Sequence, residues 1–180
     1  MMKTKSLLQD ISVWLYLFSG AIVVGATVYQ MFVIIPEFSR DAPDGMIAFA
    51  QSHVDPRNFW RSSMGIYSNL VTIIALIINW KTGRRKWLLL SIAFGIGAGI
   101  FTVVYFVPRL QIMGLIDDKT SGDSVLLITT IKEWIIADKW RFWILAVPAF
   151  FFGLKAATVP LIKQEQKNVY AAARFETAIA

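Results

Sequence analysis

Four runs of apolar residues constrain the fold of this chain more than any other feature. They cover, approximately, residues 11–35, 62–80, 87–107 and 142–162. A helix needs about 20 mostly apolar residues to cross the roughly 30 Å hydrocarbon core of a bilayer, and all four runs are near or above that length. Hydrophobic residues make up 56% of the 180 residues and charged residues only 17%, which is more apolar than an ordinary soluble domain. We therefore predict an all-α membrane protein, a single four-transmembrane-helix bundle that spans residues 1–180.

The basic residues predict which ends of these helices face the cytoplasm. The turn at residues 81–86 holds four cations in six positions, and the N-terminus and the tail at 163–180 are also basic. Short cytoplasmic loops of membrane proteins carry an excess of Lys and Arg. We therefore predict a multi-pass protein of the cell membrane with both termini in the cytoplasm. Because this topology accounts for the net charge of +6, we expect membrane lipids and not nucleic acid as partners.

The first and third apolar runs end in the same way. Gly25 and its neighbouring alanine are followed by nine residues and Pro36, and Gly97 and its alanine are followed by nine residues and Pro108. Because proline interrupts an α-helix, both prolines predict the outer end of a helix. The matching ends fit a parallel hairpin repeat about an axis along the membrane normal. They fit equally well the independent selection of residues suited to the membrane interface.

The two outer loops are each predicted to carry a short amphipathic helix at the membrane interface. Asp44 is placed to cap the first, and Ser121 or Asp123 to cap the second. In the second helix the apolar side chains that share one face are Leu127, Ile128, Ile131, Trp134 and Ile135. The loops then return to the membrane at two Trp-Arg steps, Trp60-Arg61 and Trp140-Arg141.

Small residues spaced four apart predict how the helices pack. Gly95 and Gly99 share one face of the third run, and Ala21 and Gly25 share one face of the first. Small side chains at this spacing let helix backbones approach closely. We therefore expect the first and third helices to pack against each other, or this face to serve as the interface of a homo-oligomer.

Several kinds of chemistry are excluded by residues that the chain lacks. With no cysteine and a single histidine, the chain has no disulfide, no thiolate nucleophile, no cysteine-ligated metal and no pair of histidines for haem. Pumps and channels usually carry charged groups within their membrane spans, and the four apolar runs carry none between the interface levels. We expect neither a metal nor another cofactor.

The polar residues predicted at the outer ends of the helices form the candidate site. His53 has the side chain most easily tuned to titrate near neutral pH, and an acid and an arginine follow it closely in "SHVDPR". The catalytic candidates are His53, Arg61, Asp138 and Arg141. The candidates for binding a substrate are Tyr29, Pro36, Trp60, Tyr105, Pro108 and Trp134.

Each candidate also has an explanation without catalysis. His53 fits a solvated residue of the interface. Arg61 and Arg141 fit either arginines that snorkel to the membrane surface or arginines that line a polar cavity. Tyr29 and Tyr105 fit core packing. The sequence leaves these alternatives open.

Three short motifs resemble a known family. They are Gly25 with Pro36, then Thr102, Tyr105 and Pro108 in "TVVYFVP", and then Trp134, Asp138 and Arg141 in "WIIADKWR". Together they resemble the small four-helix integral membrane family of mostly unknown function that includes the fungal anthrone oxygenases. The resemblance implies a four-helix fold. It also implies oxidation of an electron-rich phenol without a cofactor, in which His53 or a tyrosine is the base and Arg61 and Arg141 hold the oxyanion.

Three functions follow from these observations. The first, which we favour, is a membrane protein whose outward-facing pocket binds a lipophilic small molecule or a partner protein without chemistry. The second is a cofactor-independent oxygenase or related redox enzyme that acts on an anthrone-like or quinone-like substrate. The third is a transporter subunit or assembly factor that acts as an oligomer.

Overall fold

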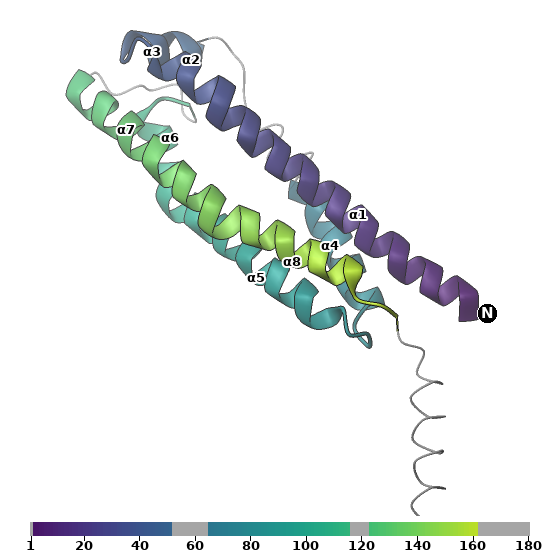
Figure 1. The fold of residues 1–180 in the computed structure, drawn as a ribbon. Coiled ribbons are helices and arrows are strands. Elements are labelled where there is room, and N and C mark those ends of the chain that lie inside the picture. The colour runs from purple at the N-terminus through teal and green to yellow at the C-terminus, as the bar shows by residue number, and fades with distance from the viewer. Residues whose placement is uncertain (1, 52–64, 116–122, 162–180) are drawn as a thin grey trace, which may run out of the picture.

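A computed structural model describes residues 2–51, 65–115 and 123–161, and this part of the chain is helical with no strand. Three long helical rods run side by side with a shorter helix (Figure 1). The first rod comprises α1 (Met2–Tyr29), the π-helical turn η1 (Gln30–Ile34) and α2 (Ile35–Ser39). The second comprises α5 (Arg85–Phe101), the π-helical turn η3 (Thr102–Phe106) and α6 (Val107–Ile112). The third comprises α7 (Ser124–Arg141), the π-helical turn η4 (Phe142–Ala146) and α8 (Val147–Thr158), while α3 (Asp44–Gln51) follows the first rod and α4 (Ile66–Ile78) precedes the second.

A proline follows the π-helical turn in each of the three rods. Pro36, Pro108 and Pro148 are each the second residue of the α-helix that comes next. A proline has no N–H to donate, and its ring clashes with the carbonyl four residues earlier in an α-helix. In each rod the residue before the proline donates to the carbonyl five residues earlier, as Ile35 does to Gln30, and the wider turn accommodates the ring. The helices therefore continue through their prolines.

This continuity corrects two expectations from the sequence. Pro36 and Pro108 do not end their helices, which run on to Ser39 and Ile112. The helix α7 was expected to lie in the plane of the membrane interface, but it is collinear with α8 in one rod (Figure 1). Arg141 accordingly lies within a long helix and does not begin one.

The expected helices of the two outer loops are nevertheless present. The first, α3, has Asp44 as its first helical residue and not as the residue before the helix. The second begins after Asp123, whose carboxylate accepts from the backbone N–H groups of Val125 and Leu126. Of its predicted apolar face, Leu127, Ile131 and Trp134 are buried. The alternative cap, Ser121, lies outside the described residues.

The π-helical turns also bear on the predicted hairpin repeat. The turns η1 and η3 occupy equivalent positions in the first and third apolar runs, each six residues ahead of its proline. The same spacing recurs in η4 with Pro148, which lies in the fourth apolar run and is not one of the two matching helix ends. Since the chemistry of proline alone explains three such turns, the similar ends of the first and third apolar runs do not require a duplicated hairpin.

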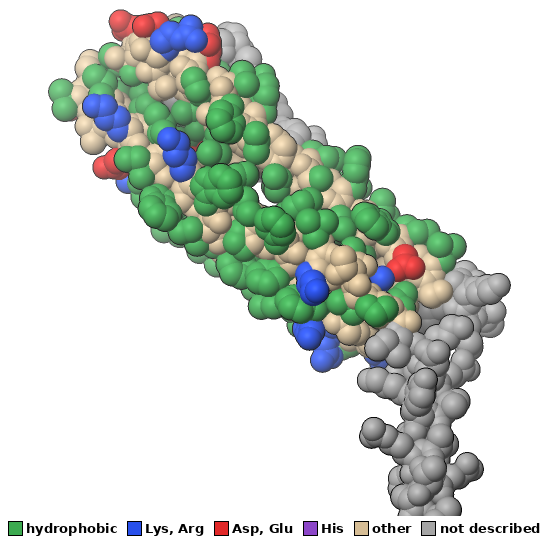
Figure 2. Space-filling view, in the orientation of Figure 1, with side chains coloured by type: hydrophobic (Ala, Val, Ile, Leu, Met, Phe, Trp, Pro, Cys, Tyr) green, Lys and Arg blue, Asp and Glu red, His purple; other side chains and the backbone are tan. Residues whose placement is uncertain are grey.

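Two helical stretches in the described chain are long and apolar enough to cross a membrane, Ser6–Glu37 and Arg85–Ile112. Within the most apolar window of each, only 28% and 11% of the residues are buried inside the protein. Large apolar side chains therefore cover the outside of the molecule, and Figure 2 shows them along most of its length. Charged side chains in the same view gather toward the two ends. Apolar surface of this extent is typical of a protein that contacts lipid or other protein chains.

The packing of the helices differs from the expectation based on small residues. The helix α5 packs mainly on α8, and α1 packs mainly on α4 and α8. A Cβ atom added at Gly25, Gly95 or Gly99 would meet no heavy atom within 4 Å. These three glycines therefore do not form a close contact between the first and third helices, and that expectation is wrong.

Close approaches occur instead between α1 and α8, at Gly20 of α1 and Gly153 of α8. A Cβ at Gly153 would lie 3.2 Å from both Leu17 and Tyr16 of α1. A Cβ at Gly20 would lie 3.4 Å from Phe150. Among the described glycines, the closest approach is therefore at Gly153, where α8 meets α1.

Candidate functional site

The predicted outer end of the molecule has its own small core. Its buried members come from η1 through α3, from η3 through α6, and from α7: Ile35, Met46, Phe106, Met113, Ile131, Trp134 and Ala137. Phe106 and Trp134 meet edge to face, with ring centroids 4.3 Å apart. This core fixes the positions of the polar side chains beside it.

Two of the predicted catalytic residues form a buried ion pair against this core. The carboxylate of Asp138 is fully buried and accepts from Nη2 of Arg141, one helical turn later on the same rod. Arg141 Nη1 donates to Thr102 Oγ1 of η3 at 2.9 Å. The guanidinium also lies over the ring of Phe106, 4.5 Å from its centroid. Arg141 therefore links the second and third rods.

One oxygen of the Asp138 carboxylate has no hydrogen-bond partner in the described chain. The unpaired atom is Oδ2, and the indole Nε1 of Trp134 is likewise buried without a partner. Burial raises the pKa of Asp138 above its ordinary range, although the charge of Arg141 and its hydrogen bond act in the opposite direction. A buried carboxylate with a free lone pair is chemically suited to take a proton.

A second ion pair flanks this arrangement nearer the surface. Arg109 Nη2 lies 2.7 Å from Glu133 Oε2, and the guanidinium stacks on Tyr105 at 3.6 Å from the ring centroid. Tyr105 in turn stacks on Phe101, with centroids 5.1 Å apart. Arg109 and Glu133 are thus structural partners that join α6 to α7.

The structure brings together part of the predicted site. Asp138, Arg141 and Trp134 lie in or against the outer core, and Tyr105 packs on its edge. Tyr29, Pro36 and Pro108 are exposed on the outside of their helices and do not join this cluster. His53, Trp60 and Arg61 lie outside the described residues. Among the described residues, no group of three or more His, Asp or Glu could hold a metal ion.

A cavity lies near the middle of the bundle, between α1, α4, α5 and α8. It has a volume of about 480 Å³. Figure 2 shows the molecule hollowed between α1 and α8 near this level. Most of its wall is apolar or small. Its polar residues are Tyr16, Ser68, Asn69, Thr72 and Ser91, and its glycines include Gly95 and Gly99. The glycines that were expected to pack helices together therefore line an open space.

Tyr16 and Ser91 supply polar atoms at one wall of this cavity. The phenolic oxygen of Tyr16 lies 2.6 Å from Ser91 Oγ, and Ser91 Oγ also donates to the carbonyl of Ala149 in α8. The absence of a side chain at Gly153 leaves room for this pair. The pairing of Tyr16 with Ser91 has no local signal in the sequence, because the two residues are 75 positions apart.

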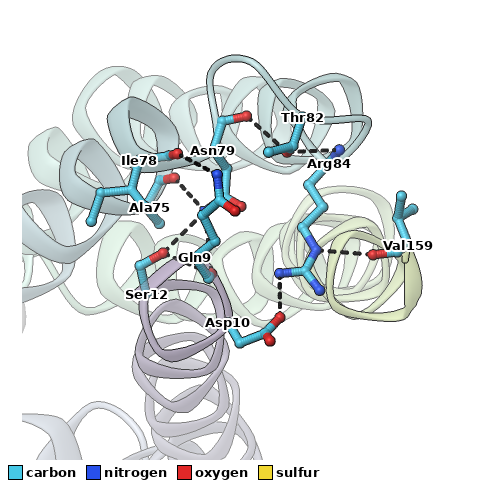
Figure 3. Close-up of polar contacts among 9 residues, drawn as sticks. All are labelled: Gln9, Asp10, Ser12, Ala75, Ile78, Asn79, Thr82, Arg84 and Val159. Atoms are coloured by element: carbon cyan, nitrogen blue, oxygen red, sulfur yellow. Dashed lines mark hydrogen bonds and ion pairs between the residues drawn. The ribbon is translucent and has the colours of Figure 1, made fainter. Parts of the chain in front are cut away.

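A polar cluster at the opposite end of the molecule was missed entirely. Asn79 is fully buried and donates through Nδ2 to the carbonyl of Ala75 at 2.9 Å and to Ser12 Oγ at 3.0 Å. Arg84 forms an ion pair with Asp10 (Figure 3). The signal available in the sequence was the cationic turn at 81–86, which was interpreted only as a sign that this loop faces the cytoplasm.

Comparison with protein-family models, with curated proteins and with solved structures finds no match to this chain.

Proposed function

We propose that this chain is a small multi-pass membrane protein that binds a lipophilic small molecule in the cavity between α1, α4, α5 and α8. The observation that carries the proposal is the cavity itself, because about 480 Å³ falls within the range typical of ligand sites and its wall is mostly apolar with a few polar atoms. The cavity opens beside residues that are exposed on α4 and α5, including Asn69 and Gly99. A lipophile dissolved in the bilayer would therefore reach it from the side.

The apolar outer surface supports the membrane setting of this proposal. On α4, Ile73 and Ile77 are 54% and 68% exposed, and on the third rod Phe151 is 63% exposed. The start of α1, the α4–α5 turn and the end of α8 lie at one end of the molecule (Figure 1). This arrangement suits four spans in alternating directions with the basic segments together on one side.

A fluorescent polycycle tests the binding proposal. The protein is reconstituted in lipid nanodiscs and titrated with 1-aminoanthracene, and the signal of empty nanodiscs is subtracted. We expect saturable binding that Gly99→Leu weakens at least about tenfold, since the new side chain would fill the cavity. Gly25→Leu is the matched control, because Gly25 is also a helical glycine with open space around it but does not line the cavity. Equal binding by both variants, or no saturable binding by the wild type, would overturn the proposal.

A second function is favoured by the buried Asp138–Arg141 pair, namely oxidation of an anthrone-like phenol without a cofactor. The unpaired Oδ2 of Asp138 is suited to take a proton from the substrate, and the guanidinium of Arg141 is suited to hold the enolate that results. The carbanion would pass electrons to O2. One oxygen atom would become the new carbonyl oxygen and the other would leave as water, so that the methylene carbon is oxidised and O2 is reduced.

Oxygen consumption tests this second function. The purified protein is supplied with anthrone, and O2 uptake is compared with that of buffer and of two variants. We expect Asp138→Asn to lower the rate at least about a hundredfold, as loss of a general base does. Asp41→Asn, at an exposed position of the same end, should keep the wild-type rate. A wild-type rate no greater than that of buffer would exclude this activity on anthrone.

A further inference from the structure

The two hydroxyl protons beside the cavity are already committed. Ser91 Oγ lies within hydrogen-bond distance of the Ala149 carbonyl and of Tyr16 Oη. A backbone carbonyl can only accept, so the single proton of Ser91 goes to Ala149. Ser91 Oγ can then only accept from Tyr16, so the phenolic O–H of Tyr16 points toward Ser91 Oγ and donates to it. Tyr16 Oη is left with lone pairs and without a proton to offer, so at this wall the cavity accepts hydrogen bonds and cannot donate them.

The opposite wall, on α4, has a different character. Thr72 Oγ1 donates its proton to the carbonyl of Ser68 at 2.7 Å, so it too presents only lone pairs. Asn69 Nδ2 donates to the carbonyl of Gly65 at 2.7 Å and keeps a second N–H. Ser68 also lines this wall and has a hydroxyl that can donate. Asn69 is exposed at the side of the bundle, where other molecules can satisfy it. The end of the cavity that is poor in donors is therefore the deeper one, at Tyr16.

The apolar surroundings of Tyr16 make the lack of a hydrogen-bond donor there important for ligand binding. Leu17, Val24, Ile92 and Phe150 also line the cavity, and none of these side chains has a polar atom. A polar ligand atom placed here has no other partner, so leaving it unpaired costs free energy. A ligand hydroxyl would donate to Tyr16 Oη, whereas the oxygen of a ketone or an ether would face lone pairs. Discrimination against an analogue that cannot make the required hydrogen bond is the usual source of selectivity in apolar sites.

We propose that the cavity selects lipophiles that carry a hydroxyl donor, that is, apolar alcohols or phenols, and that the hydroxyl lies at Tyr16. Lipophiles whose polar atoms only accept, such as ethers and ketones, are disfavoured. This inference rests on the proposed binding function and adds the chemical class of the ligand. The same geometry makes Ser91 a positioning residue, because it sets the direction of the Tyr16 proton without being the group that the ligand hydroxyl bonds.

A matched pair of ligands tests the inference. 2-Naphthol and 2-methoxynaphthalene share a ring system, and only the first has a donor. Each is used to displace 1-aminoanthracene from the protein in nanodiscs, with concentrations corrected for partition into empty nanodiscs. We expect 2-naphthol to bind about tenfold more tightly than the ether to the wild type, and the ratio to fall to about 1 in Tyr16→Phe.

A second variant separates the proton argument from a loss of folding. Ser91→Ala removes the acceptor of the Tyr16 proton, so Tyr16 can then donate to the ligand. We expect the ether to gain affinity several-fold in this variant, which a misfolded protein could not show. Equal binding of the two ligands by the wild type would overturn the donor requirement and leave the cavity as a binding site. If neither ligand nor 1-aminoanthracene displays saturable binding, the proposed function itself fails.

Discussion

Arg84 of the α4–α5 turn lies against Asp10 of α1, with 2.7 Å between Nη1 and Oδ1. Its Nε donates to the carbonyl of Val159, just after α8, at 3.0 Å. The arginine side chain is only 6% exposed, whereas that of Asp10 is 46% exposed. One buried guanidinium therefore joins the start of the chain, the central turn and the end of the third rod.

The unequal burial of this pair predicts unequal effects of breaking it. Asp10→Ala leaves a buried cation without its counter-charge, which should cost about 2 kcal/mol of unfolding free energy. Arg84→Met leaves a carboxylate that water can hydrate and should cost about 1 kcal/mol. We expect the double variant to be more stable than Asp10→Ala, as measured by denaturant titration of the protein in detergent. Arg85→Met is the control, because Arg85 is exposed and lies over Trp80. A double variant no more stable than Asp10→Ala would contradict a buried, uncompensated charge.

Asn79 is the other buried group at this end, and its loss should destabilise the bundle. Its amide bonds Ala75 of its own helix and Ser12 of α1, so Asn79→Ala removes a contact between two helices and leaves Ser12 Oγ with one acceptor site empty. We expect a cost of about 1–3 kcal/mol in the same denaturant titration. Asn69→Ala is the matched control, because Asn69 is exposed and, within the described part of the chain, its side chain donates only to the Gly65 carbonyl in the preceding turn. Similar losses in the two variants would show that the Ser12 contact has no special role.

The all-α class and several local features could be predicted from the sequence. Asp123 has the side chain of a helix cap, and Leu127, Ile131 and Trp134 have the spacing of a buried helical face, so local rules were sufficient. The prediction that Pro36 and Pro108 end their helices was wrong. A proline in the sequence shows that a backbone hydrogen bond is lost, but it does not show whether a wider turn will preserve the helix. That outcome depends on packing along the whole rod.

The candidate site was predictable only in part, for a related reason. Asp138 and Arg141 are one helical turn apart, so their pairing has a local signal. The contacts of Arg141 with Thr102 and of Tyr16 with Ser91 join residues far apart in sequence. Such contacts depend on which helices are neighbours, and the small-residue pattern indicated the wrong neighbours for α1 and α5.

The glycines give a direct test of the observed helix packing. An alanine at Gly153 would put its Cβ 3.2 Å from Leu17 and Tyr16, so we expect Gly153→Ala to destabilise the protein by about 1–3 kcal/mol. An alanine at Gly95 would meet nothing within 4 Å, and its better helix propensity should stabilise the protein by about 0.5–1 kcal/mol. Thermal midpoints in detergent measure both. Destabilisation by Gly95→Ala would indicate that α5 makes a close helix contact there, as the sequence pattern had suggested.

The buried carboxyl of Asp138 predicts a pH dependence of stability with a defined sign. Burial raises its pKa in the folded protein above the ordinary value of 3.8, so the folded state holds this proton more tightly than the unfolded chain does. The stabilising effect of that proton is complete below pH 3.8 and is lost as the pH rises through the folded pKa. Across this window the wild type should lose up to about 1.4 kcal/mol per pH unit relative to Asp138→Asn, whose side chain does not titrate.

Stability measured by denaturant titration at several pH values between 4 and 8, in the same detergent, tests this sign. Asp138→Asn differs from the wild type by a constant offset from its altered hydrogen bonds, so the comparison depends on slopes and not on absolute stability. Asp41→Asn removes an exposed carboxylate from the same end of the molecule and should follow the wild-type slope. If the wild type instead lost stability relative to Asp138→Asn as the pH fell, the attraction of Arg141 would outweigh burial. The pKa of Asp138 would then lie below its ordinary value in the folded protein, and its carboxylate would be a weak base.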